Sequence, residues 1–145
     1  MSASNAWLLD FGMPVRAAVG ARELVQILDG AATFTVPLTP RYSRCVVVWQ
    51  QRLLPVFDLA RKMGAAEGER TLLAVVGYHG APGQAVQFGA LALAAPPVRI
   101  AVSDQQACPL AEQQAEWGAL ALSCFEHGGT PIPVLHLERI FGVLP

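Results

Sequence analysis

The feature that most constrains the fold is the stretch at residues 45–64, which predicts a strand, a tight turn, a second strand and a capped helical turn in that order. It opens with three consecutive valines and Trp49, and branched and aromatic side chains are typical of strands. A polar step and a second apolar run follow. Asp58 is a good N-cap for a short helix, and Gly64 is a good left-handed stop.

The second apolar run of this stretch contains Pro55. Because proline cannot donate to a ladder, we expect the second strand to end or bulge near Pro55, or to lie at the edge of a sheet.

Composition narrows the class of protein. A chain of 145 residues fits one domain or two small lobes that share a core. Hydrophobic residues make up 53% and charged residues 14%, which is enough apolar surface for a packed core. The net charge is −1, so the chain lacks the basic footprint expected of a nucleic-acid-binding protein.

No segment predicts insertion into a membrane. The longest apolar run, residues 90–98, is interrupted by two prolines and is far shorter than the roughly 20 residues that a spanning helix needs. The N-terminal segment has no basic region and carries Asp10 early, which argues against a signal peptide. Three cysteines do not make a disulfide framework, so we expect reduced thiols in a cytoplasmic protein.

Short strands separated by turns dominate the rest of the chain. The expected strands are residues 6–11, 15–19, 33–36, 45–49, 53–57, 71–76, 85–93, 98–102, 119–125 and 132–135. Helices are expected at residues 22–28, 59–63 and 137–141, and residues 109–117 are a weak helix or a long loop. About ten short strands with turns between them are typical of all-β barrels and sandwiches.

The two halves of the chain echo each other. The sequence P-V-F-D-L at residues 55–59 and the sequence P-V-L-H-L at residues 133–137 both precede an expected helix. We expect both halves to close in the same way, with a strand leading into a short helix. A polar loop at residues 65–70 is the expected boundary between two lobes.

The stretch around residues 45–64 resembles the signature of the CheW-like chemotaxis coupling proteins, roughly G-V-I-N-L-R-G-R-x-x-P-V-x-D-L. Five residues match it in order and spacing: Arg52, Pro55, Val56, Asp58 and Leu59. Upstream, Thr39-Pro40 followed by Tyr42 resembles the approach to the same motif, and residues 24–27 stand where the family has V-x-E-I. The resemblance is good from about Trp7 to Gly64 and looser as far as Phe141.

The resemblance implies a mainly β fold of two small five-stranded, SH3-like β-barrel lobes with short helices. Lobe one is expected at about residues 1–66 and lobe two at about residues 67–145, with the C-terminal segment able to pack back on lobe one. It also implies a non-enzymatic adaptor that couples the cytoplasmic tip of a chemoreceptor to the regulatory domain of a histidine kinase. By analogy alone, the array could be one that controls type IV pilus motility.

The sequence departs from the family at the charged pair. The family's glutamate of V-x-E-I and arginine of N-L-R-G correspond to Gln26 and Gln50 here. We expect Gln26 and Gln50 to face each other and exchange an amide hydrogen bond; the alternative, two unrelated surface glutamines, stays open. The residues expected to form the partner surface are Leu24, Gln26, Ile27, Trp49 and Gln50.

Other departures lie nearby. The family glycine after the arginine is Gln51, which predicts ordinary backbone angles in this turn. Trp49 replaces a leucine and is expected to be a core anchor, with an exposed hot spot as the alternative. The segment at residues 90–100 lacks the aspartate that the family carries there, so lobe two could be remodelled.

No reactive constellation stands out. Cys45, Cys108 and Cys124 occur with His79, His127 and His136, but no nucleophile signature surrounds them. Cys124 and His127 are a pair, not a set of four metal ligands, and no cofactor motif is present, so we expect neither metal nor cofactor. His136 at a strand–helix junction is expected to cap the helix or lie at the surface. A scaffold or homodimer that binds neither receptor nor kinase, and a small enzyme using Cys108 or Cys124, remain as alternatives.

Overall fold

The computed structural model describes residues 3–14, 16–39, 43, 45–64, 72–79, 83–109 and 117–142 of the chain. The described elements are β1 (Ala3–Leu9), β2 (Ala17–Gly20), β3 (Leu24–Asp29), β4 (Thr33–Thr35), β5 (Cys45–Trp49), β6 (Arg52–Phe57), α1 (Leu59–Lys62), β7 (Leu72–His79), β8 (Val86–Leu93), β9 (Val98–Ser103), the 3₁₀ helix η2 (Asp104–Gln106), β10 (Ala121–His127), β11 (Thr130–Leu135) and α2 (Leu137–Gly142). The predicted mainly β fold is confirmed.

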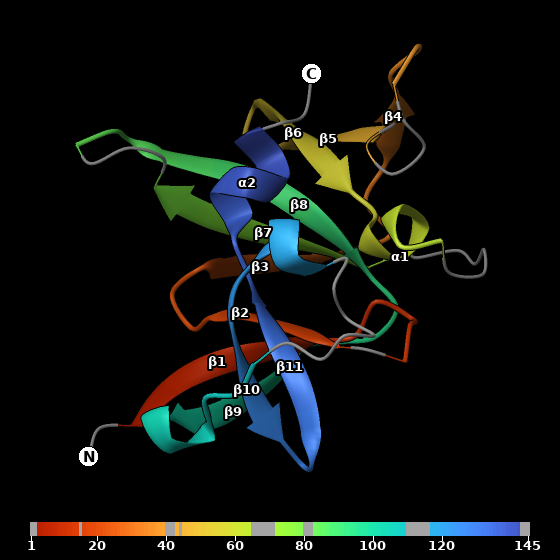
Figure 1. Cartoon of the computed structure of the whole chain (residues 1–145). Coiled ribbons are helices and arrows are strands. Elements are labelled where there is room, and N and C mark those ends of the chain that lie inside the picture. Colours follow the sequence, from red (N-terminus) through yellow and green to blue (C-terminus); the bar gives the residue numbers. More distant parts are fainter. Residues whose placement is uncertain are drawn as a thin grey trace.

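The strands form two curled sheets (Figure 1). The five-stranded sheet has the order β10-β11-β2-β1-β9, and the six-stranded sheet has the order β3-β7-β8-β6-β5-β4. Figure 1 shows the five-stranded sheet below the six-stranded one, with α2 in front of the latter. The prediction of two small barrel-like lobes is therefore confirmed, although one sheet has a sixth strand because the short β4 pairs with β5.

Three clusters of apolar side chains make up the core. The central core lies between the sheets and takes Leu9 from β1, Phe57 from β6 and Leu135 from β11. A second cluster lies on the other face of the six-stranded sheet, and a third on the other face of the five-stranded sheet. In β7, Ala74 and Val76 join the central core while their neighbours join the second cluster. Since both faces of β7 are covered, its residues 72–76 are all apolar rather than alternating.

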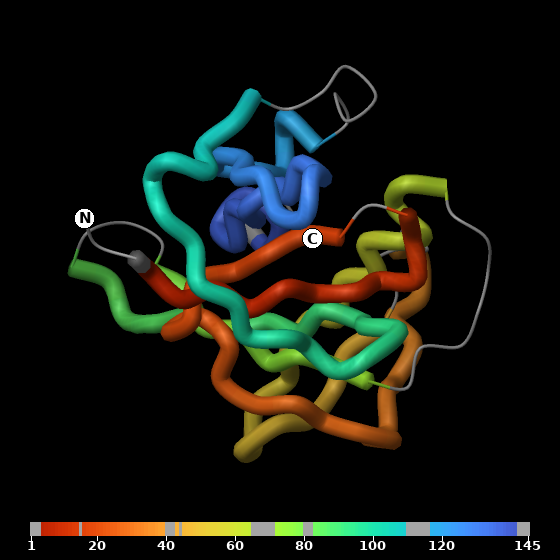
Figure 2. The backbone as a smooth tube through the Cα atoms, turned by 90° about the horizontal axis from the view of Figure 1, so that it is seen from below, coloured from red at the N-terminus to blue at the C-terminus, as the bar shows by residue number. Residues whose placement is uncertain are grey.

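The chain crosses from one edge of the five-stranded sheet to the other through residues 104–109, which we call the strap. Figure 2 shows this segment leaving β9 and rising toward β10 and β11. Ala107 forms an antiparallel bridge with Phe125 of β10, and the Gln106 side-chain Nε2 donates to the Glu126 carbonyl at 2.9 Å. The strap therefore links the two edge strands of this curled sheet, β9 and β10.

The echo between the two halves is confirmed in three dimensions. We call residues 45–62 the first unit and residues 123–140 the second unit. Each is a hairpin that leads through a capping residue into a short helix: β5, β6 and α1 in the first, β10, β11 and α2 in the second. The second strand of each unit makes a parallel pairing, β6 with β8 and β11 with β2.

The predicted helix at residues 22–28 is wrong, because this segment contains the strand β3. Leu24 and Ile27 both pack against the central core although they are three residues apart. A bulge shifts the pairing of β3 with β7 between Leu24 and Gln26 and adds one residue to the strand. A bulged strand therefore imitated the i, i+3 spacing of a helix.

The second strand of the first unit does not end at Pro55. β6 continues to Phe57 and lies inside its sheet, between β5 and β8. The pairing of β6 with β8, however, covers only Val56 and Phe57. Pro55 thus lies just before the second ladder begins, where a missing N–H leaves that ladder intact.

The turn between β5 and β6 also differs from expectation. Gln50 and Gln51 have φ angles of 48° and 65°, so the prediction of ordinary backbone angles at Gln51 is wrong. Two consecutive left-handed residues are the geometry that matches the twist of a two-residue hairpin. The twist of the sheet thus imposes this conformation even without the glycine.

The loop at residues 65–70, expected to divide two lobes, lies outside the described residues, as do Pro40, Tyr42, Thr71 and residues 110–116. Both sheets draw strands from both sides of this loop: β1 and β2 join β9 to β11, whereas β7 and β8 join β3 to β6. The C-terminal helix α2 brings Phe141 against Phe57 of β6, with ring centroids 6.5 Å apart.

Candidate functional site

Trp49 is a core anchor, as expected. Its side chain is 7% exposed and lies in the second cluster, with its ring centroid 5.1 Å from that of Phe88 on β8. Its indole Nε1 donates to Gln26 Oε1 at 3.0 Å. A buried indole N–H needs such a partner, so Gln26 stabilises the position of Trp49.

The predicted hydrogen bond between Gln26 and Gln50 is wrong, because Gln26 bonds a different residue. The carbonyl oxygen of the Gln26 side chain accepts from Trp49, and no hydrogen bond joins Gln26 to Gln50 among the described residues. Gln50 is exposed at the tip of the β5–β6 hairpin. The side chain of Gln26 thus bonds Trp49, the residue before the expected partner.

The five predicted partner residues occupy three environments. Leu24 and Ile27 are half-buried against the central core, Trp49 is buried in the second cluster, and Gln26 and Gln50 are exposed. Trp49 joins two of them, because Gln26 is bonded to it and Gln50 follows it in the chain. The structure therefore brings Gln26 of β3 and Trp49 of β5 together across the curled six-stranded sheet, with Gln50 following Trp49 in the chain.

An apolar patch on β4, β5 and β6 was not predicted from the sequence. It consists of Phe34, Val48 and Leu53, whose side chains are 54%, 52% and 68% exposed. Val48 and Leu53 are direct cross-strand partners. Their neighbours Val47 and Leu54 point to the buried second cluster, so strand alternation places Val48 and Leu53 on the opposite face. That alternation is the signal that could have identified the patch.

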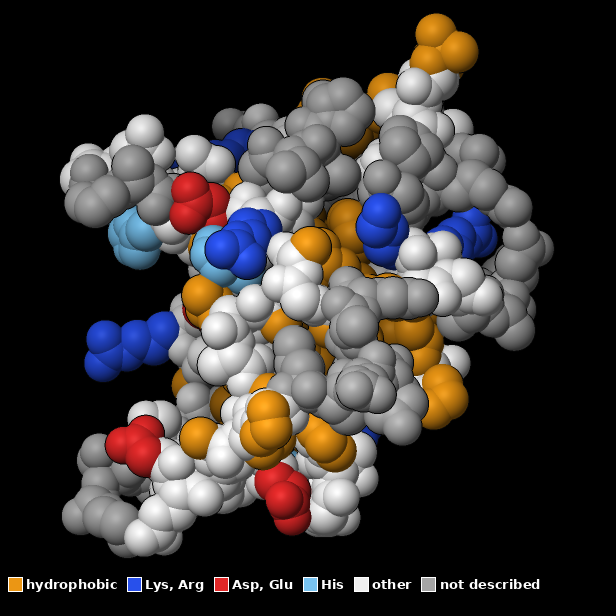
Figure 3. Space-filling view, in the orientation of Figure 1, with side chains coloured by type: hydrophobic (Ala, Val, Ile, Leu, Met, Phe, Trp, Pro, Cys, Tyr) orange, Lys and Arg blue, Asp and Glu red, His pale blue; other side chains and the backbone are white. Residues whose placement is uncertain are grey.

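The surface seen from the side of α2 is mixed. Figure 3 shows hydrophobic side chains in a broken band through the middle of this face, with basic side chains beside them. Large exposed apolar side chains elsewhere include Val98 on β9 and Leu122 on β10. The patch on β4, β5 and β6 differs from these because its three members lie on adjoining strands.

Each helix-capping residue accepts a hydrogen bond from the backbone N–H three residues later in its own helix. Asp58 Oδ1 accepts from the Arg61 N–H at 3.2 Å, and His136 Nδ1 accepts from the Arg139 N–H at 3.3 Å. In addition, Arg61 Nε lies 3.3 Å from Asp58 Oδ2. The expectation that His136 caps the terminal helix is confirmed, so this histidine is satisfied structurally.

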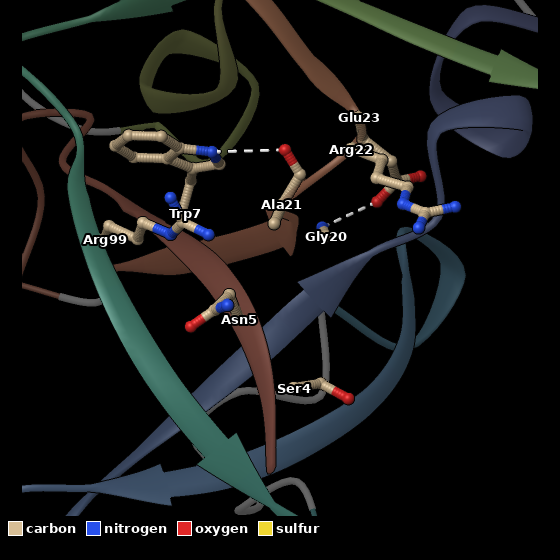
Figure 4. Close-up of a pocket in the computed structure, with 8 residues that line it drawn as sticks. All are labelled: Ser4, Asn5, Trp7, Gly20, Ala21, Arg22, Glu23 and Arg99. Carbon is tan, nitrogen blue, oxygen red and sulfur yellow. Dashed lines mark hydrogen bonds between the residues drawn. The ribbon is translucent and has the colours of Figure 1, made fainter. Parts of the chain in front are cut away.

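An open cavity of about 690 Å³ lies beside β1, the turn after β2, and β9 (Figure 4). Its floor includes Trp7, whose Nε1 donates to the Ala21 carbonyl at 3.3 Å. Glu23 Oε1 accepts from the Gly20 N–H at 2.7 Å, and burial raises the pKa of Glu23 above its usual value. The remaining lining residues are Ser4, Asn5, Arg22 and Arg99. The carboxylate of Glu23, the one acidic group among the described lining residues, is thus already engaged by the backbone.

The described side chains carry little sign of catalytic or metal chemistry. Burial, together with the hydrogen bond and the charge of Cys108, raises the pKa of the Cys124 thiol to about 12, whereas a catalytic cysteine needs a lowered pKa. No group of three or more His, Cys, Asp or Glu side chains in the described part of the chain could hold a metal ion. Within the same part, no helix has the length and hydropathy to cross a membrane.

Comparison with known proteins rests on structure alone. No family model matches the chain, and no curated protein matches it in sequence. The crystal structure of the scaffolding protein TtCheW from Thermoanaerobacter tengcongensis matches with a TM-score of 0.77 at 13% sequence identity, covering 98% of this chain and 94% of that chain. The chain therefore has a CheW-like fold, although its sequence has little in common with that of the scaffolding protein.

Proposed function

We propose that this chain is a non-enzymatic, cytoplasmic adaptor that couples a chemoreceptor-type sensor to a histidine kinase in a chemosensory-type signalling array. Similarity of fold to a protein described as a scaffolding protein supports this assignment over an enzymatic one. The finer possibility, control of type IV pilus motility, belongs to the same proposal.

The observation that carries the proposal is the apolar patch of Phe34, Val48 and Leu53. Three large apolar side chains that are more than half exposed on neighbouring strands cost solvation free energy in an isolated protein. Such a group suits the apolar centre of a protein–protein interface, where aromatic and aliphatic side chains become buried.

Of the predicted partner residues, Gln50 adjoins this patch. Gln50 lies between Val48 and Leu53 along the β5–β6 hairpin and can supply a polar rim. Trp49, buried and bonded to Gln26, stabilises the hairpin from its other face rather than touching a partner. We therefore propose a partner surface of Leu24, Gln26, Ile27 and Gln50, extended by the patch, with Trp49 supporting it from the buried face of the hairpin.

The test measures binding of the full chain to two purified probes from the same organism: the regulatory domain of a chemosensory histidine kinase, and a helical receptor-tip fragment. We expect Leu53→Glu to weaken binding of at least one probe about tenfold or more, because it puts an unpaired charge at the centre of the interface. Gln50→Glu at the rim should weaken binding less.

A matched control is Leu122→Glu on β10, since Leu122 is 63% exposed but lies on the other sheet. It should bind both probes like the wild type. Equal affinity of the Leu53→Glu variant and the wild type for both probes would remove the patch from the interface. Failure of the wild type to bind either probe, together with elution as a dimer that Leu53→Glu disrupts, would favour the homodimeric scaffold instead.

A further inference from the structure

One thiol of the strap and one of the second unit lie in contact. Cys108 is on the strap and Cys124 is on β10, and their Sγ atoms are 3.1 Å apart. Cys124 is buried and Cys108 is half-buried, and both are free cysteines. The third cysteine, Cys45, lies on β5 in the other sheet.

The backbone holds these two residues opposite each other. Ala107 bridges Phe125 in antiparallel fashion, so the next residue along the strap faces Cys124. The Cys108 N–H donates to the Cys124 carbonyl at 3.1 Å, which fixes this register. Antiparallel partners have Cα atoms about 4.5–5.5 Å apart, within the range of about 4.4–6.8 Å that disulfides span.

The first unit provides independent support for the register. There, β4 runs beside β5 and pairs Thr33 with Val47 and Phe34 with Val46. Val47 and Val46 occupy the positions of Phe125 and Cys124 in the second unit, because both hairpins pair their strands in the same register. The contact of Cys108 with Cys124 thus corresponds to the direct cross-strand pair of Phe34 with Val46.

We propose that Cys108 and Cys124 are a redox modification site that forms a reversible intramolecular disulfide between the strap and β10. The sulfur atoms need to approach by about 1 Å to reach a bond length of about 2.05 Å. That shift is small because the strap is already bonded to β10 through both Gln106 and Cys108. This inference does not rest on the proposed function.

The oxidant we name is hydrogen peroxide. The thiolate of the half-exposed Cys108 attacks one peroxide oxygen, which breaks the O–O bond and yields a sulfenic acid and hydroxide. The Cys124 sulfur then attacks the Cys108 sulfur, forming the S–S bond and breaking the S–O bond. The departing hydroxide leaves as water with the Cys124 proton. In total two thiols lose two electrons, and one peroxide becomes two waters.

The two cysteines have different roles in this sequence because their surroundings differ. Burial is the main reason that the pKa of Cys124 is raised to about 12, so this sulfur stays protonated at neutral pH. Cys108 is more exposed and is the sulfur that a dissolved oxidant can reach. Cys124 therefore resolves the sulfenic acid rather than forming one.

A disulfide would lock the strap onto the edge strand of the five-stranded sheet. It would close a covalent loop over residues 108–124, which lowers the entropy of the unfolded chain. We expect the oxidised protein to melt about 10 °C above the reduced one, with the difference abolished by dithiothreitol.

The test treats the full reduced chain with hydrogen peroxide and then alkylates it under denaturing conditions. We expect one alkylated cysteine, Cys45, against three in the reduced chain, and a peptide map that joins Cys108 to Cys124. Cys45→Ser should respond in full, whereas Cys108→Ser should lose both the crosslink and the rise in melting temperature.

Cys108→Ser is the main variant because Cys108 is only half-buried, so the substitution leaves the core in place. Cys124→Ala is a second variant that avoids a buried hydroxyl. Conversion of Cys108 to a sulfinic acid without a crosslink, or retention of three alkylated cysteines after peroxide treatment, would overturn the proposal.

Discussion

The first and second units share one register but use different residues at the turn, the cap and the helix. Each pairs a residue of its first strand with a valine of its second, Cys45 with Val56 and Ser123 with Val134, and each sets a proline one step earlier. These valines are also where both units make their parallel pairings, each with an alanine. The shared geometry is therefore that of the backbone, and the side chains vary within it.

The turns illustrate this clearly. The first unit turns through Gln50 and Gln51, and the second through Gly128 and Gly129, and all four residues have positive φ angles. Glycine adopts such angles without a steric cost, whereas glutamine does not. The first unit thus keeps a strained turn, next to the exposed apolar patch proposed to bind a partner.

The caps differ in charge. Asp58 accepts from the backbone of α1 and also lies close to Arg61 within the same helix. His136 accepts from the backbone of α2 through a ring nitrogen, and the charged group that interacts with it, Glu23, comes from outside the unit. The second cap is therefore coupled to the turn after β2, whereas the first lies close to a basic residue of its own helix.

The helices differ most in how they are fixed to the six-stranded sheet. α2 carries Phe141, which stacks on Tyr78 with ring centroids 5.8 Å apart and lies directly over Gly89. A Cβ atom at Gly89 would lie 2.5 Å from Phe141 Cε1. The absence of a side chain at Gly89 is what allows the aromatic ring to sit on β8.

Among the substitutions that test this comparison, Gly89→Ala should change the stability of the protein most. The added methyl group collides with Phe141, and we expect a loss of about 1–3 kcal/mol in the free energy of unfolding, measured by urea titration. Phe141→Leu in the same chain should recover part of that loss, because the ring is the atom group in the way. Gly118→Ala is the control, since a Cβ there meets nothing within 4 Å. Equal stability of the two alanine variants would refute this explanation.

Substitutions in the two hairpin turns should change the free energy of unfolding by smaller amounts and in opposite directions. Gln51→Gly should raise the free energy of unfolding by up to about 1 kcal/mol, because it relieves a left-handed glutamine. Gly129→Ala should lower it by about 1 kcal/mol, because a Cβ is introduced at φ 79°. Urea titration of both variants beside the wild type measures the difference. A destabilised Gln51→Gly variant would show that the first turn is not strained.

Local signals were sufficient to predict most of each unit. The strand at residues 45–49, the cap at Asp58 and the stop at Gly64 all depend on neighbours in the chain, and the structure has each of them. The repeat of P-V-F-D-L and P-V-L-H-L was enough to predict a common closure. β3 was missed because a bulge is a property of the pairing with β7, which no periodicity in one strand reveals.

The candidate site was harder to predict, for the same physical reason. Gln26 and Trp49 meet only because β3 and β5 curl around the second cluster, and nothing local specifies that Gln26 bonds Trp49 rather than Gln50. The contact of Cys108 with Cys124 depends on the strap crossing from β9 to β10. The apolar patch was available from strand alternation, because Val48 and Leu53 alternate with the buried Val47 and Leu54.

The smallest effect concerns the link between Glu23 and the second cap. Burial raises the pKa of Glu23 above 4.5, and the nearby charge of His136 lowers it in part. Because the folded chain then binds this proton more tightly than the unfolded chain, the contribution of Glu23 to stability falls as pH rises from about 4.5 through the folded pKa. Glu23→Gln keeps an acceptor for the Gly20 N–H, so its stability relative to wild type should increase between pH 4 and pH 7, as thermal melts at each pH would measure.

Glu126→Gln removes an exposed carboxylate and controls for the loss of one negative charge. In the His136→Ala variant, carbon-detected NMR titration should find the pKa of the Glu23 carboxyl higher still. An unchanged Glu23 pKa in the His136→Ala variant would break this link between Glu23 and the second cap.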